Sequence, residues 1–237
     1  IKRAVADANN AILRYKDVQP LYRRMGCVAT AGIIDLDEET LSIAHVGDSR
    51  LYRFSDGELS KLTHDHSLVG YQEEQGILTE EQAMKHPRRS VIERCLGSDN
   101  HLADDKYFIE AGVFPLIKGE KFIFCSDGLS DVLTSAEISD CLRTEASTEE
   151  ECHSLISRVN AAGGKDNVTV IIAHVFEIEN SNPLKENDDI SKVESDLMSN
   201  NQNSQSHKTI DCKRKRYWIY FIVALLVLLS FCIVFWV

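Results

Sequence analysis

Two acidic turns, each beside an apolar run, hold the residues whose types and spacing best suit chemistry. Asp127 follows the run at residues 122–125, and Asp166 precedes the run at residues 168–175. Short apolar runs bounded by turn residues are typical of buried strands. Two carboxylates brought together at strand edges repel each other unless a cation or proton lies between them, and such oxygen ligands suit Mg²⁺ or Mn²⁺. The pattern predicts a metal site; ordinary turn aspartates are the alternative for either step alone.

The bulk composition narrows the class of protein. The chain has 237 residues, 43% of them hydrophobic and 27% charged, with a net charge of -11. An acidic balance of this size argues against nucleic-acid binding, which depends on phosphate neutralisation. The seven cysteines include no Cys-x-x-Cys pair, so neither a zinc knuckle nor a disulfide framework is predicted. Four of them are expected to pack as small apolar side chains in a reducing compartment: Cys27, Cys95, Cys125 and Cys141.

Hydrophobic periodicity predicts an α+β domain over residues 1–176, because strands come first, then a helical pair, then a last strand. Asp56-Gly57 is a hairpin signal within a predicted antiparallel meander. Ser135 and Thr148 are predicted to cap the two helices. The expected elements are a helix over 1–17, strands over 26–34, 41–46, 51–54, 59–62, 107–113 and 122–127, helices from 135 and 148, and a strand over 168–175.

Residues 64–97 interrupt the strands with a polar segment, which we expect to be a mobile flap over one edge of the sheet. Thr79 begins a capping-box pattern, so a short helix is predicted from Glu80. His64 and His66 could be metal ligands, but no third partner stands at an informative spacing. A solvated loop is the preferred interpretation of the His-Asp-His sequence.

The C-terminal part of the chain predicts a membrane tether. Residues 177–212 form a polar linker with too little apolar surface to fold. Residues 213–216 are all basic, and residues 218–237 form an uncharged apolar stretch long enough for one transmembrane helix in the segment 213–237. The basic cluster predicts a single-pass protein of the cell membrane with its domain facing the cytoplasm.

Four motifs together point to a family. They are AHVGDSR at residues 44–50, HPRR at 86–89 with Leu96-Gly97, CSDGLSD at 125–131 and GKDNVTV at 164–170. Their order and spacing over about residues 1–175 resemble the bacterial form of the PP2C-type (PPM) metal-dependent Ser/Thr protein phosphatases. The resemblance implies a PP2C-like β-sandwich flanked by helices, with two Mn²⁺ or Mg²⁺ ions at one edge.

The resemblance also assigns residues. Asp127 and Asp166 would be ligands of one ion, and Asp48 with Asp127 would hold a third, weaker ion. Asn167 and Gly128 would position these ligands, and no catalytic side chain beyond the metal ligands is expected. The flap would modulate substrate access. For Asp48, a hairpin aspartate bonded to Arg50 is the alternative.

The implied activity is hydrolysis of phosphoserine and phosphothreonine in proteins, in which paired metals activate water for attack on phosphorus. Expected partners are phosphoprotein substrates, among them a membrane Ser/Thr kinase. The alternative is a non-catalytic, membrane-tethered binding module with the same fold. The family's Asp-Gly-x-Gly-Gly loop, whose Asp bridges the two ions, should lie upstream of residue 1. The chain is therefore expected to be an N-terminally incomplete fragment that assembles no complete site alone.

Overall fold

The computed structural model describes residues 1–144, 146–176 and 222–226. Its elements are α1 Lys2–Val18, η1 Pro20–Tyr22, β1 Ala29–Asp35, β2 Thr40–Val46, β3 Arg50–Ser55, β4 Glu58–Lys61, α2 Leu68–Glu74, α3 Glu80–Met84, β5 Glu110–Pro115, β6 Lys121–Cys125, α4 Asp127–Ser130, α5 Ser135–Leu142, α6 Thr148–Ala161, β7 Val170–His174 and β8 Ile222–Leu226.

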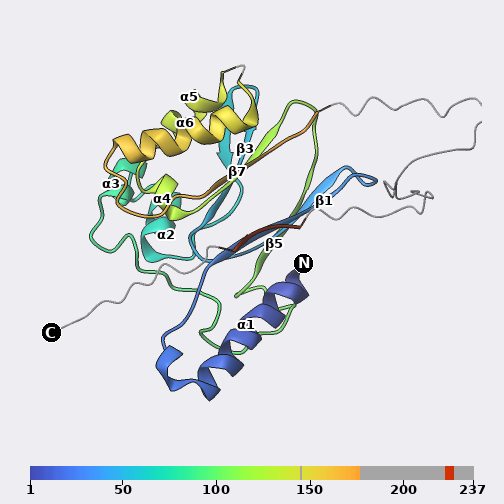
Figure 1. Ribbon diagram of the computed structural model, residues 1–237, viewed down its shortest axis with the longest axis vertical. Helices are drawn as coiled ribbons and strands as arrows, with labels where there is room; N and C mark the ends of the chain where they lie inside the picture. Colours follow the sequence, from blue (N-terminus) through green and yellow to red (C-terminus); the bar gives the residue numbers. More distant parts are fainter. Residues whose placement is uncertain (145, 177–221, 227–237) are drawn as a thin grey trace, which may run out of the picture. The chain divides into compact units, whose positions relative to one another are not determined.

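The strands form two antiparallel sheets, ordered β5-β2-β1-β8 and β4-β3-β6-β7. Figure 1 shows α5 and α6 over the second sheet and α1 on the side of the first sheet. The predicted α+β architecture is confirmed. The predicted meander is divided, because β2 and β3 are consecutive in sequence but belong to different sheets. The turn between them, at residues 47–49, carries the chain from one sheet to the other.

The space between the sheets is filled by large apolar side chains from both. Leu41 and Ile43 of β2 meet Leu51 of β3 and Phe122 and Phe124 of β6, and all are almost fully buried. Strand β6 is buried along its whole length. A strand covered on both faces has no polar side to alternate with, which explains its continuous apolar sequence.

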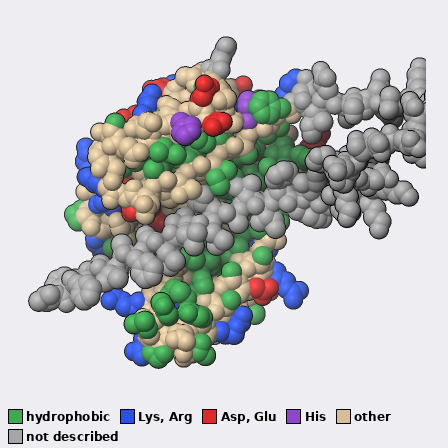
Figure 2. Space-filling model, viewed as in Figure 1, with side chains coloured by type: hydrophobic (Ala, Val, Ile, Leu, Met, Phe, Trp, Pro, Cys, Tyr) green, Lys and Arg blue, Asp and Glu red, His purple; other side chains and the backbone are tan. Residues whose placement is uncertain are grey.

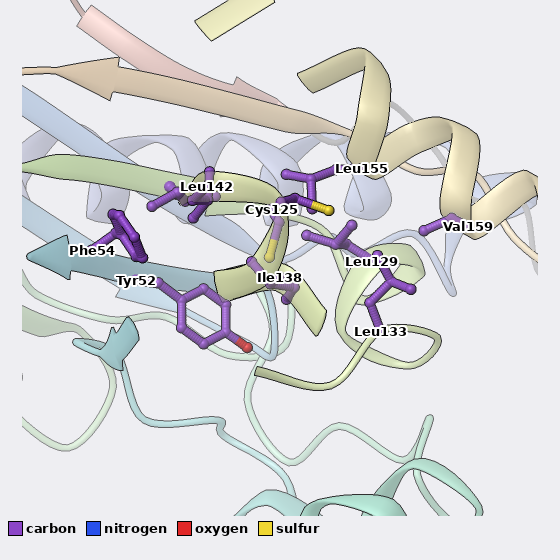
Figure 3. Packing of buried hydrophobic residues seen from close by; sticks show 11 residues of the cluster. Tyr52, Phe54, Cys125, Leu129, Leu133, Ile138, Leu142, Leu155 and Val159 are labelled. Atoms are coloured by element: carbon purple, nitrogen blue, oxygen red, sulfur yellow. The ribbon is translucent and has the colours of Figure 1, made fainter. Parts of the chain in front are cut away.

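The outer faces of the sheets are covered by helices. Figure 3 shows Leu142 of α5 and Leu155 of α6 near Cys125 of β6, in a cluster that also contains Tyr52 of β3. On the other sheet, α1 contributes Val5 and Ala6 to a cluster with Ala44 and Val46 of β2. The sandwich is therefore a four-layer stack in which every sheet face has an apolar partner.

A buried ion pair joins β6 to α6. The Lys121 ammonium contacts the carboxylate of Glu151, whose side chain is fully buried, and also donates to the carbonyl oxygen of Leu142 at 3.1 Å. The same ammonium lies 5.8 Å from the centroid of the Phe54 ring. Breaking such a pair from one side leaves an uncompensated buried charge.

Several element boundaries differ from the sequence expectation. Helices α5 and α6 are capped by Thr134 and Ser147, one residue earlier than predicted, and each cap is a complete capping box. Strand β5 begins at Glu110 rather than at residue 107, because the Asp105 carboxylate accepts from the backbone N–H groups of residues 107 and 108. Local side-chain bonds of this kind compete with strand pairing.

The predicted linker 177–212 and most of the predicted membrane helix 218–237 lie outside the described residues. The five residues of that stretch that are described, Ile222–Leu226, form β8 and pair antiparallel with β1, from Ala29↔Leu226 to Ile33↔Ile222. A short apolar run suits a buried strand as well as a helix, since its periodicity does not separate the two. Among the described parts of the chain, no helix has the length and apolar character needed to cross a bilayer.

We predict that Lys121→Met lowers the free energy of unfolding by about 3 to 5 kcal/mol, because Glu151 is left buried without its cation. The double variant Lys121→Met/Glu151→Leu should recover most of the loss. Urea midpoints followed by circular dichroism measure both effects. Arg3→Ala is the control, since Arg3 and Asp7 form an exposed pair at 3.9 Å, and its midpoint should not move. Equal losses in the single and double variants would contradict the explanation.

Candidate metal centre

The pairing of β6 with β7 places the two predicted aspartates at the same end of one sheet. The ladder ends at Cys125↔Val170. It continues for one more residue, because Ser126 N donates to the Thr169 carbonyl at 3.1 Å and Thr169 N donates to Ser126 Oγ at 3.1 Å. Asp127 then opens α4, and Asp166 lies four residues before β7. The structure therefore brings together the pair that the sequence predicted.

Gly128 allows the two turns to approach closely. A Cβ at this position would lie 2.3 Å from the carbonyl oxygen of Asn167, and a shift of backbone would be needed to relieve it. Gly128 is helical and does not have a positive φ. This position therefore requires the absence of a side chain, not a left-handed backbone. Asn167 contributes here through its backbone: its N–H donates to Asp166 Oδ1 at 2.7 Å.

Burial and neighbouring carboxylates raise the pKa of Asp127 and of Asp48 at this end of the sheet. Burial raises the pKa of Asp127, and the neighbouring Asp166 raises it further. Burial and then the charge of Asp127 raise the pKa of Asp48 to about 7. Asp166 itself is exposed. Mutually repelling carboxylates at the edge of a core are an arrangement that a bound cation relieves.

Asp48 lies on the turn between the sheets and lines the same shallow pocket as Asp127. The turn is tight: Gly47 has a φ of 120°, and a Cβ there would lie 2.3 Å from Cβ of Val28. The guanidinium of Arg50 bonds Asp65, Glu73 and Tyr52, and not Asp48. The alternative in which Asp48 is a hairpin aspartate bonded to Arg50 is therefore wrong.

Two residues that the sequence interpretation did not assign also reach this pocket. Asp131 lines it, and burial followed by the charge of Asp127 raises the pKa of Asp131. Arg89, from the segment 64–97, donates to Asp131 from Nε to Oδ2 at 3.0 Å. The spacing of Asp131, four residues after Asp127, could have revealed it, because positions i and i+4 share a helix face.

The segment 64–97 is anchored at its first residues. Arg50 Nη2 lies 2.6 Å from Asp65 Oδ2 and 2.9 Å from Glu73 Oε2 on α2. Asp65 and His66 are buried, and Val69 belongs to the core. The expectation of a solvated loop at His64-Asp65-His66 was therefore wrong for Asp65 and His66, whereas His64 is exposed. Buried charges are tolerated because they are paired.

The far end of the segment is tied to α1. The fully buried Asn9 accepts from Gly97 N at 2.7 Å and donates to the Asp99 carbonyl at 2.7 Å. Lys16 Nζ donates to the Gly97 carbonyl at 2.5 Å. The backbone at residue 27 pairs with residue 96 through two bonds, of 3.2 and 2.7 Å. The middle of the segment is also bonded to the domain, because Glu80 Oε1 accepts from Ser135 N at 2.8 Å and from Ser135 Oγ at 2.7 Å.

Glu110 supplies the partner that His64 and His66 lacked in the sequence. His45, His66 and Glu110 have ligand atoms within 4.8 Å of one another. The Gly47 N–H donates to His66 Nδ1 at 3.1 Å, so the ring proton of His66 is on Nε2, which lies 3.7 Å from Glu110 Oε2. In this tautomer Nε2 carries a proton, so it has no lone pair to offer to a metal ion.

His45 leads to the same conclusion. Its Nε2 lies 3.0 Å from the His64 carbonyl, which only accepts, so Nε2 carries the proton and Nδ1 accepts from Thr30 Oγ1 at 2.8 Å. Burial, followed by the effect of His66, lowers the pKa of His45 to about 4. The cluster is therefore a hydrogen-bonded network that fixes the first residues of the flap against β5.

Comparisons with known proteins identify the family of the chain. A family model described as protein phosphatase 2C matches residues 1–170. The serine/threonine phosphatase Stp of Listeria welshimeri is 31% identical over 172 residues, which are 73% of this chain and 66% of the relative. PstP of Mycobacterium tuberculosis is 35% identical over 176 residues, covering 74% of this chain and 32% of the relative.

A solved structure of the PstP catalytic domain, in complex with two manganese ions, has a TM-score of 0.62 and 31% identity, covering 71% of this chain and 67% of that chain. The chain therefore belongs to the PP2C family of serine/threonine protein phosphatases. It spans just under two thirds of the length of Listeria Stp and about one third of PstP.

We predict that Glu110→Gln destabilises the fold most at intermediate pH. Burial opposes ionisation of Glu110, but hydrogen bonds from His66 and His64 outweigh it and lower its pKa from 4.5 to about 2. A lowered carboxyl pKa gives stability that is present above 4.5 and is lost as the pH falls toward about 2. The hydrogen bond to Glu110 also raises the pKa of His64. The stability that protonated His64 contributes is therefore lost as the pH rises past this raised pKa.

Urea midpoints of the wild type and the variant, measured at pH 3, 5, 7 and 9, test the prediction. The difference between the two proteins should be largest in the middle of this range and shrink at both ends. Glu58→Gln, at an exposed position in β4, should give no such profile. A difference that is constant with pH would contradict it.

Proposed function

We propose that the protein hydrolyses phosphoserine and phosphothreonine in proteins with the help of Mn²⁺ or Mg²⁺. The observation that carries the proposal is the junction of β6 and β7, which holds Asp127 and Asp166 side by side with Asp48 on the facing turn. Membership of the PP2C family supports the reaction class, and the two manganese ions of the PstP relative support the metal. The acidic chain and its shallow, charged pocket suit a polar substrate better than an apolar one.

The residues present fit such ions. Asp127 and Asp166 would hold one cation, and Asp48 with Asp127 would hold a further, weaker one, while Gly128 and Asn167 keep the two turns in contact. All these donors are carboxylate oxygens, which hard divalent cations prefer. When bound, paired divalent ions lower the pKa of a bridging water and clamp the phosphate.

The chain's own residues position the substrate. Arg89 lies on the flap with its guanidinium at Asp131, and both line the pocket that contains Asp48 and Asp127. A cationic fork at this rim is suited to an anionic phosphopeptide, because a guanidinium matches phosphate geometry. The bond to Asp131 holds Arg89 at this rim.

We predict that Asp127→Asn and Asp166→Asn in the full-length gene product each lower Mn²⁺-dependent hydrolysis of an aryl phosphate by more than about a hundredfold. Substitutions outside the ligand set of metal sites already cost about 10- to 100-fold. Asp48→Asn should have a smaller effect, visible mainly at low metal concentration. Circular dichroism should show an unchanged fold in all three.

The control is Asp56→Asn, which alters the other Asp-Gly step of the chain, in an exposed hairpin turn with a φ of 52°. It should retain full activity. Near-normal turnover by Asp127→Asn or Asp166→Asn would remove the assignment. If the wild type binds Mn²⁺ in a calorimeter but hydrolyses neither aryl phosphate nor phosphopeptides, the non-catalytic binding module is the better description.

We further propose that the protein is anchored in the cell membrane through residues 218–237, with its domain in the cytoplasm. The uncharged apolar stretch and the basic residues 213–216 support the proposal. The strand β8 and a spanning helix are alternative uses of residues 222–226, so insertion would release the edge of β1. A tether of this kind would raise the effective concentration of membrane-bound phosphoproteins, including a Ser/Thr kinase.

The anchoring proposal predicts that carbonate at high pH leaves the full-length protein in the membrane fraction. Protease added to intact spheroplasts should spare the domain, whereas protease added to lysed cells should digest it. Release by carbonate would show that there is no span. Digestion in intact spheroplasts would show that the orientation is reversed.

A further inference from the structure

The end of α1 and the turn η1 form an exposed corner that combines apolar and basic side chains. Val18 is 70% exposed, Leu21 is 86% exposed, and Tyr15 and Tyr22 are also on the surface. Figure 2 shows hydrophobic side chains at the end of the molecule occupied by α1 and η1 in Figure 1, with Lys and Arg side chains beside them. We call this set, residues 14–24, the α1–η1 corner.

The charge of the corner is opposite to that of the whole chain. Residues 14–24 contain Arg14, Lys16, Arg23 and Arg24 against the single acidic residue Asp17, whereas the chain has a net charge of -11. Lys16 bonds the Gly97 carbonyl. Among the described residues, the other three basic side chains have no ion-pair partner within 4.0 Å, and all three are exposed. The corner therefore offers uncompensated positive charge.

The corner is also pre-formed. The rings of Tyr15 and Tyr22 lie 5.6 Å apart, so η1 is folded back against α1. Successive backbone bonds hold the turn, from Gln19 N to the Tyr15 carbonyl at 3.1 Å and from Tyr22 N to the Gln19 carbonyl at 2.9 Å. Because the turn is already ordered, Val18 and Leu21 can be buried in a partner without a large ordering cost.

We propose that the α1–η1 corner docks on an anionic lipid surface, with Leu21 and Val18 entering the interface and Arg23 and Arg24 meeting lipid headgroups. Protruding apolar side chains rimmed by basic ones are the combination that binds such surfaces. A lipid surface also requires no complementary shape, which suits side chains that project from a convex turn. This contact is separate from residues 218–237 and needs no transmembrane segment.

The test uses the full chain with a reporter at the corner. The chain has two tryptophans, at positions 218 and 236, so Trp218→Phe and Trp236→Phe clear the background for Leu21→Trp. The protein is mixed with vesicles of phosphatidylcholine alone or of phosphatidylcholine with phosphatidylglycerol. We expect the emission of this tryptophan to shift to the blue, and to be quenched by brominated acyl chains, only in the anionic vesicles.

The charge dependence is tested in the same protein. In the variant Arg23→Gln/Arg24→Gln, the lipid concentration needed for half of the anionic-vesicle signal should rise by about 25-fold, since each basic residue near such a surface contributes about fivefold. Raising the salt concentration should have the same effect. The matched control Lys85→Gln/Lys106→Gln removes equal charge from exposed positions elsewhere and should leave the signal unchanged.

A second reporter, Leu36→Trp, distinguishes the corner from adsorption by another face, because Leu36 is 56% exposed in the turn between β1 and β2. Its emission should not respond. Equal shifts of both reporters, or a shift at position 21 that is the same in neutral and anionic vesicles, would overturn the proposal. A response at position 21 to polyglutamate but not to vesicles would also overturn it and assign the corner to an acidic protein.

Discussion

The repulsion between carboxylates at the end of β6 and β7 is the constraint around which the domain is arranged. Asp127 and Asp166 are held near each other by a backbone ladder and by the contact of Gly128 with Asn167, not by any attraction between their side chains. The free energy for this comes from the apolar layers on both faces of β6. A buried, fully paired strand is what allows a like-charged pair to persist until a cation reaches it.

The flap is held by attraction between buried opposite charges. Arg50 is buried and is satisfied by Asp65 and Glu73, which bind the flap to β3, the strand that follows Asp48. The network of His66 and Glu110 secures the same end against β5. The other end of the flap is fixed by Asn9 and Lys16 of α1. Because both ends are fixed, the sandwich itself sets the position of Arg89 relative to Asp131.

The sequence was most informative where one local rule determined the outcome. The apolar run of β6, the hairpin at Asp56-Gly57 and the turn positions of Asp127 and Asp166 all follow from patterns within a few residues. What could not be read were contacts between distant segments. Glu110 meets His64 across 46 positions, and Asn9 meets Gly97 across 88, and neither spacing has a local signature. The helix α2 was also missed, because its buried face is created by Arg50 and the core rather than by its own periodicity.

Helix α1 connects two parts of the protein that serve different purposes. Its polar side chains Asn9 and Lys16 bond the backbone of Gly97, where the flap ends. Its last turn belongs to the exposed α1–η1 corner and ends at Val18. Because a helix moves as a rigid body, a displacement of the corner would also move the side chains that bond Gly97. By thermodynamic reciprocity, whatever fixes the flap in one position would change how strongly the corner holds its own ligand.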